Sequence, residues 1–161
     1  MVKDTEVSMD QDLAVYVLIR NDLPSLNSGK LAAQVHHAGV QMMVKHSDHD
    51  LVKSYVSSGT AQGADGFNTT LTLSATIDQI KTAIARLQHL DALFNVVIDP
   101  TYPFLVDREL APLLEANTSV TRVGGNGAME LFLRQELTCA WSLGDRNDAV
   151  FKSVFENLPL F

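Results

Sequence analysis

Two apolar patterns dominate the first third of the chain. Residues from Leu13 to Ile19 form an almost unbroken apolar run rich in β-branched and aromatic types, as in a strand covered on both faces. From Lys30 to His46, apolar residues recur at intervals of three and four, which predicts the buried face of a helix. That apolar face comprises Leu31, Val35, Ala38 and Met42. Asn27 or Ser28 would cap the helix, because their side chains can accept from its free N–H groups.

The middle of the chain again predicts helices and a strand in succession. Residues 48–57 favour a short helix closed by Gly59, and residues 60–66 favour a surface loop. Residues 67–75 alternate apolar side chains with Thr and Ser, which predicts a half-buried strand. Residues 76–90 return to helical spacing. The order of these elements is typical of a sheet covered by helices.

The next strand is predicted over residues 93–98. Pro100 is expected to end it, because proline cannot donate to a strand ladder. Asp99 should then lie at a strand terminus facing a loop, which is where α/β sheets place chemistry.

The last third of the chain predicts four elements. A helix is expected over residues 107–117, shortened by Pro112, and a β-hairpin over 118–134 around Gly-Gly-Asn-Gly. A strand over 136–143 and a helix over 147–155 follow.

Composition narrows the function classes. With 19 acidic and 12 basic residues the net charge is −7, so any contact with nucleic acid must be local. The single Cys139 cannot form an internal disulfide, and no run approaches the length needed to cross a bilayer. We expect a cytoplasmic protein of one domain spanning residues 1–161, with residues 1–12 disordered.

The segment from Tyr16 to Gly39 resembles the opening strand, loop and helix of the peptidyl-tRNA hydrolase type 2 family. The family pattern there is an apolar strand, then R-x-D-L, then G-K-[IVL]-A-A-Q-x-x-H-A. The matching residues are Arg20, Asp22, Leu23, Gly29, Lys30, Ala32, Ala33, Gln34, His37 and Ala38. So many matches in order make the resemblance specific.

A second match lies near the C-terminus. Residues 137–145 are similar to the family's final strand, T-V-x-A-[IL]-G-P, through Thr138, Ala140, Leu143 and Gly144. Between the two matches, Asp99 stands where the family has R-D-A-G, although this chain reads Ile-Asp-Pro-Thr over residues 98–101. Residues 100–136 are divergent and longer than the family pattern, so we interpret them as an insertion.

The resemblance implies an α/β three-layer sandwich, with a four-stranded mixed sheet, helices on both faces and the insertion as a helix and hairpin. It implies hydrolysis of the ester that joins a peptide to tRNA, with peptidyl-tRNA as partner, no membrane, and no metal or organic cofactor. A homodimer would be compatible with the family.

Six residues are the candidate site. Lys30, in the first turn of a helix, could bind phosphate or stabilise the oxyanion, and Asp99 could orient the water and pair with Lys30. Gln34 and His37 could extend the polar wall, Thr138 could donate a hydrogen bond, and Arg20 could form a basic rim with Arg108 or Arg122. The remaining site threonine would be Thr101, Thr118 or Thr121.

Other interpretations stay open. Without the resemblance, Lys30 would be a solvated lysine and Asp99 a turn former. His46 and His49, near Asp48 and Asp50, fit a solvated helix junction better than a metal site. The chain could also be an inactive family member that binds a partner through residues 100–136, or a hydrolase of another ester or amide.

Overall fold

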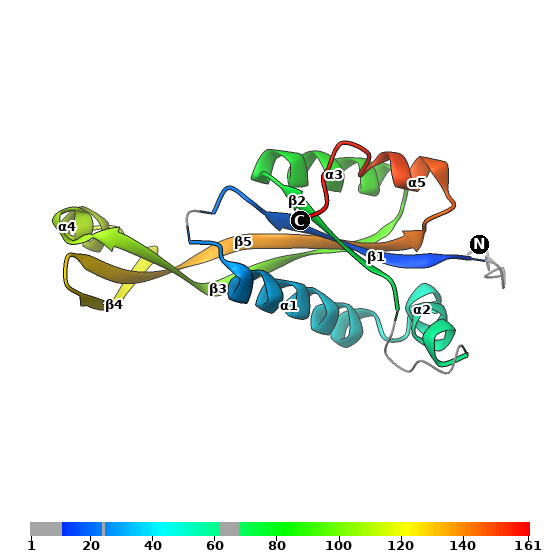
Figure 1. The fold of residues 1–161 in the computed structure, drawn as a ribbon, viewed down its shortest axis with the longest axis horizontal. Coiled ribbons are helices and arrows are strands. Elements are labelled where there is room, and N and C mark those ends of the chain that lie inside the picture. The colour runs from blue at the N-terminus through cyan, green and yellow to red at the C-terminus, as the bar shows by residue number, and fades with distance from the viewer. Residues whose placement is uncertain (1–10, 24, 62–67) are drawn as a thin grey trace.

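A mixed sheet of five strands forms the centre of the protein (Figure 1). The computed structural model describes residues 11–23, 25–61 and 68–161. The strands are β1 (Leu13–Arg20), β2 (Thr70–Ala75), β3 (Leu93–Asp107), β4 (Val120–Asn126) and β5 (Met129–Asp145). Their order is β2-β1-β5-β3, with β4 paired to β5. β1 and β2 are parallel, and the other pairs are antiparallel.

Helices cover both faces of the sheet (Figure 1). One face carries α1 (Ser28–His46) and α2 (Asp50–Ala61), and the other carries α3 (Ile77–His89) and α5 (Ala149–Ser153). The short helices η1 (Arg108–Leu110) and α4 (Ala111–Glu115) lie at one end of the sheet, away from these four helices. This mixed α/β architecture agrees with the predicted fold class, but the sheet has five strands where four were expected. In the described part of the chain, no helix is long and apolar enough to span a membrane.

The first strand separates two apolar cores. All eight residues of β1 are buried, because helices lie over both of its faces. Val15 and Val17 pack with Trp141 on the side of α1 and α2. Tyr16 points to the opposite core, where its ring stacks on Phe155 with centroids 4.4 Å apart. The unbroken apolar run was therefore a correct signal for a central strand.

Side-chain caps mark where the helices α1 and α3 begin. The Asn27 side chain accepts a hydrogen bond from the Lys30 N–H at 3.0 Å, so Asn27 is the cap and α1 begins at Ser28. Thr76 and Gln79 form a reciprocal capping box at the start of α3. The α1 cap fixes where the Lys30 side chain leaves the helix.

The third strand does not end at Pro100, contrary to the prediction. β3 continues to Asp107, with register shifts between Val97 and Ile98 and between Asp99 and Tyr102. Pro100 and Thr101 have no partner in the β5 ladder, so the missing proline N–H costs no hydrogen bond there. Pro100 thus lies in a bulge, and β3 continues on both sides of that bulge.

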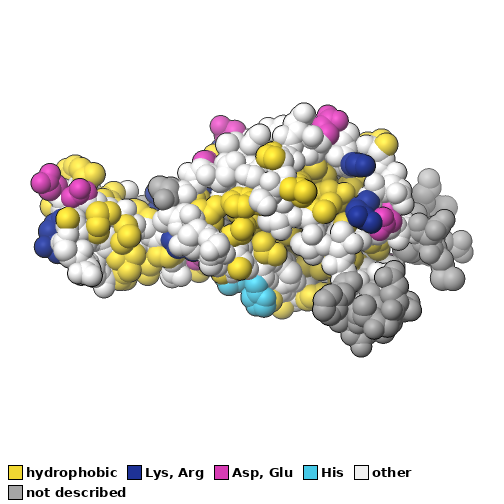
Figure 2. Space-filling view, in the orientation of Figure 1, with side chains coloured by type: hydrophobic (Ala, Val, Ile, Leu, Met, Phe, Trp, Pro, Cys, Tyr) yellow, Lys and Arg dark blue, Asp and Glu magenta, His cyan; other side chains and the backbone are white. Residues whose placement is uncertain are grey.

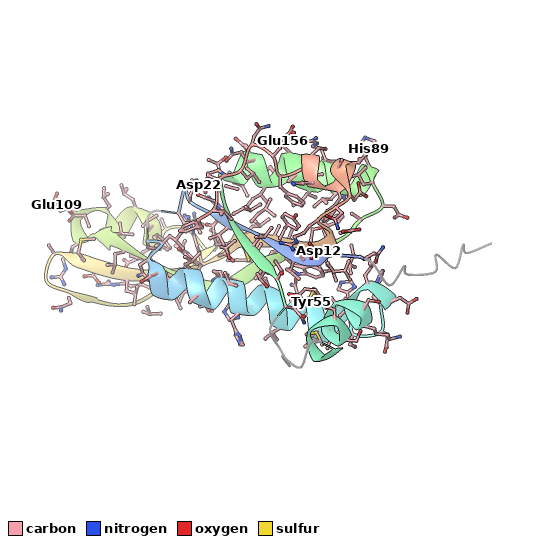
Figure 3. All side chains as sticks on the ribbon, turned by 45° about the vertical axis from the view of Figure 1, so that its right-hand side comes forward. Asp12, Asp22, Tyr55, His89, Glu109 and Glu156 are labelled. Atoms are coloured by element: carbon pink, nitrogen blue, oxygen red, sulfur yellow. The ribbon has the colours of Figure 1, made fainter. Side chains whose placement is uncertain are left out.

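The predicted hairpin strand over 128–134 and the strand over 136–143 are one continuous strand, β5. Together with the far half of β3 and with β4, β5 builds an extension of the sheet, residues 100–136, that projects beyond the helices (Figure 1). Phe104, Ala111 and Phe132 form a small core of its own. Figure 3 labels Glu109 at the far end of this extension.

Smaller differences concern element ends. α2 runs past Gly59 to Ala61, and α5 ends at Ser153. Pro112 lies in the first turn of α4, where it is tolerated, rather than late in a longer helix. Of the predicted disordered segment 1–12, residues 1–10 lie outside the described residues, but Asp12 forms an ion pair with Arg146. The predicted loop over 60–66 lies largely outside them too.

A buried carboxylate holds the extension together. The Glu130 side chain is only 1% exposed and accepts hydrogen bonds from Arg108 Nε at 2.7 Å and Arg122 Nε at 3.2 Å. Arg122 also pairs with Glu115, at the end of α4. The hydrogen bond from Arg108, followed by that from Arg122, lowers the pKa of Glu130 below its usual 4.5 despite the burial.

We predict that acid weakens this fold through two carboxylates. A hydrogen bond from Arg20 lowers the pKa of Asp22 below 3.8, as Arg108 and Arg122 lower that of Glu130 below 4.5. Carboxylates with depressed pKa values stabilise the fold fully above about pH 5 and lose that contribution as the pH falls through the folded-state values. Urea unfolding of wild type and Glu130→Gln at neutral and acid pH should show a smaller acid loss in the variant. Equal acid losses would contradict the assignment to Glu130.

Candidate active site

The candidate site lies where the first turns of α1 face the bulged part of β3. Lys30 and Gln34 come from α1, Asp99 and Thr101 from the bulge, and Thr138 from the adjoining part of β5. The structure brings these residues together through backbone elements that are far apart in sequence.

Gln34 is the link between the helix and the two strands. Its side chain is 3% exposed, and its Nε2 donates to Asp99 Oδ2 at 3.2 Å. Its Oε1 accepts from the hydroxyl of Thr138, which is fully buried. Gln34 was predicted to extend a polar wall together with His37, apart from the apolar face of the helix, but it lies on the buried face with Ala38 and Met42. The spacing of four between these residues contained that signal.

Asp99 is fixed from two directions. Besides the amide of Gln34, its carboxylate accepts the Thr101 N–H at 2.9 Å, with the Thr101 hydroxyl 3.5 Å away. Asp99 is thus both a turn-stabilising residue and a partly exposed carboxylate. Of the three competing threonines, Thr101 is the one at Asp99, whereas Thr118 precedes β4 and Thr121 lies within it.

Lys30 does not form the expected ion pair with Asp99 among the described residues. Its Nζ donates to the carbonyl oxygen of Pro103 at 2.9 Å and lies 4.9 Å from the centroid of the Tyr102 ring. The difference arises because β3 continues past Asp99 and brings these two residues beneath α1. Burial lowers the pKa of Lys30, and the charge of Asp99 acts against that shift.

Three residues that shape this site carry no recognisable pattern in the sequence. Ser25 donates to the Pro103 carbonyl oxygen at 2.9 Å, and its hydroxyl also lies 3.4 Å from the Tyr102 hydroxyl. The Pro103 carbonyl therefore accepts from both Ser25 and Lys30. These contacts depend on the path of β3 beyond the bulge, which local patterns cannot give.

The arginines considered for a basic rim are paired with carboxylates. Arg20 is largely buried and forms ion pairs with Asp22 at 2.8 Å and with Glu136. Arg108 and Arg122 are held by Glu130 in the extension. A contact between Arg20 and substrate remains a prediction. On the face in Figure 2, Lys and Arg side chains are scattered.

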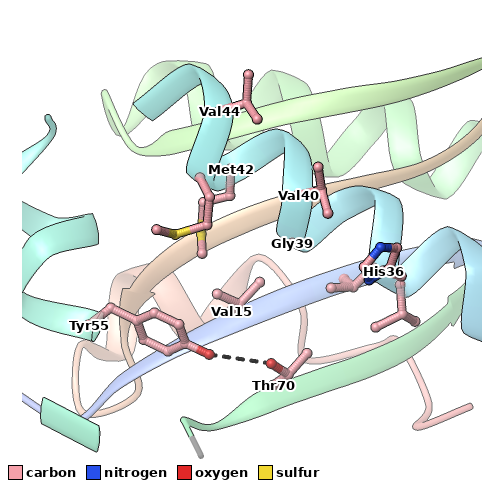
Figure 4. A pocket seen from close by; sticks show the side chains of 11 residues that line it. Val15, His36, Gly39, Val40, Met42, Val44, Tyr55 and Thr70 are labelled. Carbon is pink, nitrogen blue, oxygen red and sulfur yellow. Dashed lines mark hydrogen bonds between the residues drawn. The ribbon is translucent and has the colours of Figure 1, made fainter. Parts of the chain in front are cut away.

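In the described part of the chain, at least three hollows border α1. His37 and Lys45 line one of about 320 Å³ that reaches Asp99 and Pro100. Another, of about 460 Å³, lies toward β2 and is lined by His36, Tyr55, Thr70 and mostly aliphatic side chains (Figure 4). The two neighbouring histidines thus face different sides of the helix, as expected from their angular separation.

The remaining polar clusters have structural roles. The His46 ring packs edge-on against Trp141 with centroids 5.5 Å apart, and His49 Nδ1 accepts from the Leu51 N–H. Within residues 11–23, 25–61 and 68–161, no group of three or more His, Cys, Asp or Glu residues is arranged to hold a metal ion. Burial raises the pKa of Cys139 to about 12, so its thiol stays protonated.

Comparison with known proteins decides the family. The model of the family described as "Peptidyl-tRNA hydrolase PTH2" matches residues 13–97, which is 85 of the 161 residues. This chain belongs to that family. The matched range contains Lys30, Gln34 and His37 but stops two residues before Asp99. The family assignment therefore rests on the core of the fold and on the α1 side of the site.

Other comparisons add little. No curated protein matches the chain. A solved structure of a protein of unknown function from Agrobacterium tumefaciens str. C58 aligns with 11% identity and a TM-score of 0.42, over 93% of this chain and 98% of that one.

We predict that the Gln34 link contributes measurably to stability. Thr138→Val removes the hydroxyl and leaves the buried Gln34 Oε1 without its donor, which should cost about 1–3 kcal/mol. Thr121→Val, on the exposed face of β4, is the matched control and should stay within about 0.5 kcal/mol. Urea unfolding measures both. A similar small loss in the two variants would show that the link is unimportant for stability.

Proposed function

We propose that this protein hydrolyses the ester bond between peptide and tRNA in peptidyl-tRNA by means of an activated water. Ester hydrolysis requires a positioned water and a donor or positive charge near the oxygen that becomes negative in the transition state. The observation that carries the proposal is the hydrogen bond between Gln34 and Asp99, because it holds the bulge of β3 against the helix that carries Lys30.

Lys30 is proposed to stabilise the developing oxyanion. An ammonium group has three donors, and one of them is used by the Pro103 carbonyl oxygen. The other two can turn toward a bound ester. Partial burial strengthens such an interaction, since a charge acts more strongly where water is excluded.

Asp99 is proposed to orient the attacking water. Gln34 occupies Oδ2, and Thr101 occupies Oδ1, so the carboxylate is held in one orientation while its remaining lone pairs can accept from water. Thr138 acts on Asp99 through Gln34, and we therefore regard it as a positioning residue. A cysteine nucleophile is disfavoured, because the Cys139 thiol is buried and protonated.

Contacts with tRNA are proposed to be few and close to the reacting end. The described arginines near the site and in the extension are committed to acidic partners, and the chain is acidic overall. Such a protein would bind tRNA with a shallow salt dependence, because few phosphates would be neutralised. The proposal includes a single cytoplasmic domain over residues 1–161, with residues 100–136 as an insertion. A homodimer remains a prediction.

The decisive assay follows release of N-acetyl-aminoacyl groups from N-acetyl-aminoacyl-tRNA, with free aminoacyl-tRNA as the substrate control. We expect turnover by wild type and a loss of on the order of a hundredfold in Lys30→Ala and in Asp99→Asn. Lys152→Ala and Asp50→Asn are matched controls, since both residues are exposed and lie on other helices. Circular dichroism of each variant checks folding.

A second candidate is an inactive family member that binds a partner through residues 100–136. It is favoured by one observation, namely that Lys30 Nζ is already bound to Pro103 and stacked near Tyr102, both within that segment. Absence of turnover by folded wild type would reject the hydrolase and favour this candidate. Turnover that survives in both Lys30→Ala and Asp99→Asn would retain a hydrolase but reject this site.

The electrostatic link between the two residues can be measured separately. Burial lowers the pKa of Lys30, and Asp99 partly reverses the shift, so Asp99→Asn should lower that pKa further. An NMR titration of the lysine side chains, with Asp50→Asn as control, gives the value directly. An unchanged Lys30 pKa in Asp99→Asn would mean that the two groups do not interact.

A further inference from the structure

The groove beside Asp99 has no role in the steps above. It lies between the outer flank of α1 and the edge of β3 and has a volume of about 320 Å³. This volume is at the lower end of the range for small-molecule sites, about 300–1,000 Å³. Its lining comprises His37, Val40, Gln41, Val44, Lys45, Val97, Ile98, Asp99 and Pro100. Asp99 therefore belongs both to the candidate site and to the groove.

The walls of the groove are largely aliphatic. Val40, Val44 and Ile98 are 46%, 76% and 48% exposed, so each presents apolar surface to whatever lies there. Covering such surface with an apolar group is favourable in proportion to the area removed from water. His37 and Lys45 lie on the α1 side of this lining.

The one amide in the groove is already committed. Gln41 Oε1 accepts from the indole N–H of Trp141 at 2.9 Å, and its Nε2 donates to the carbonyl oxygen of Val96 at 3.0 Å. Gln41 therefore has little capacity left to recognise the edge of a nucleobase, and the groove has no Phe, Tyr or Trp on which a base could stack. These features disfavour the terminal adenosine of tRNA as the occupant.

The edge of β3 is also closed to an added strand at this point. β3 is the last strand in the order β2-β1-β5-β3, but the N–H and the carbonyl of Val96 are bonded by the side chains of Asn95 and Gln41. A peptide cannot pair with these groups as a further strand. What the groove offers is a place for a side chain.

We infer that this groove receives the side chain of the peptide's last residue, the one esterified to tRNA, and that it selects aliphatic side chains. The inference rests on the proposed function. That side chain branches from the carbon next to the attacked carbonyl, so it must lie a few bonds from the water that Asp99 orients. The groove begins at Asp99 and continues along apolar walls, which meets this requirement.

Analogues that cannot be cleaved test the inference apart from catalysis. The probes are 3′-amino-3′-deoxyadenosine carrying N-acetyl-leucyl, N-acetyl-asparaginyl or N-acetyl-glycyl groups through an amide. Calorimetry on wild type should give at least about tenfold tighter binding of the leucyl probe than of the other two, since aliphatic contact favours leucine over an equally large polar side chain.

Variants assign that preference to the groove. Val44→Asp and Ile98→Asp should each reduce the leucyl preference to within about twofold and leave glycyl binding unchanged. Met43→Asp is the matched control, because Met43 is 41% exposed on the same helix and lines the hollow toward β2, which Val44 also borders, but it does not line the groove. It should keep the full preference.

For wild type, equal binding of the three probes or no binding of any probe would overturn the inference. For the variants, a leucyl preference that survives both groove substitutions, or one that is lost in Met43→Asp, would also overturn it. The hydrolysis assay reports separately on the proposed function. A leucyl preference in a protein without turnover would refute the hydrolase and keep the groove assignment. Turnover without any preference among the probes would support the hydrolase and refute the groove assignment.

Discussion

The buried amide of Gln34 is the interaction on which the site depends. It connects α1 to the bulge of β3 through Asp99 and to β5 through Thr138, so three elements that are distant in sequence have one fixed relative position. A buried polar side chain is stable only when its groups are bonded, and here donor and acceptor both have partners. The orientation of the Asp99 carboxylate follows from the same requirement.

The parts of the fold that depend on local pattern could be predicted from the sequence. β1 was indicated by its apolar run and α1 by its spacing and its Asn27 cap, because these features reflect burial and hydrogen bonding within one element. Pro100 led to a wrong prediction of the strand end, because proline is tolerated in a bulge and the location of the bulge depends on pairing with β5. The path of β3 to Asp107 could not be obtained from local sequence.

The candidate site likewise contains residues that the sequence could indicate and residues that it could not. Lys30 and Gln34 were found through a resemblance, and Gln34 could also have been placed on the buried face by its spacing from Ala38. Ser25 and the carbonyl of Pro103 could not be found, since a main-chain oxygen has no signature in sequence. Whether the arginines form a basic rim could not be decided from the sequence, because acidic partners such as Glu130 become neighbours only when the extension folds.

The continuity of β3 and β5 has a mechanical consequence. Both strands run without a break from the centre of the sheet into the extension, and the bulge that carries Asp99 lies at the crossing point. The extension is therefore joined directly to that bulge by both strands. A displacement of the tip near Glu109 is therefore expected to move the Pro103 carbonyl that Lys30 contacts, because both belong to the same pair of strands.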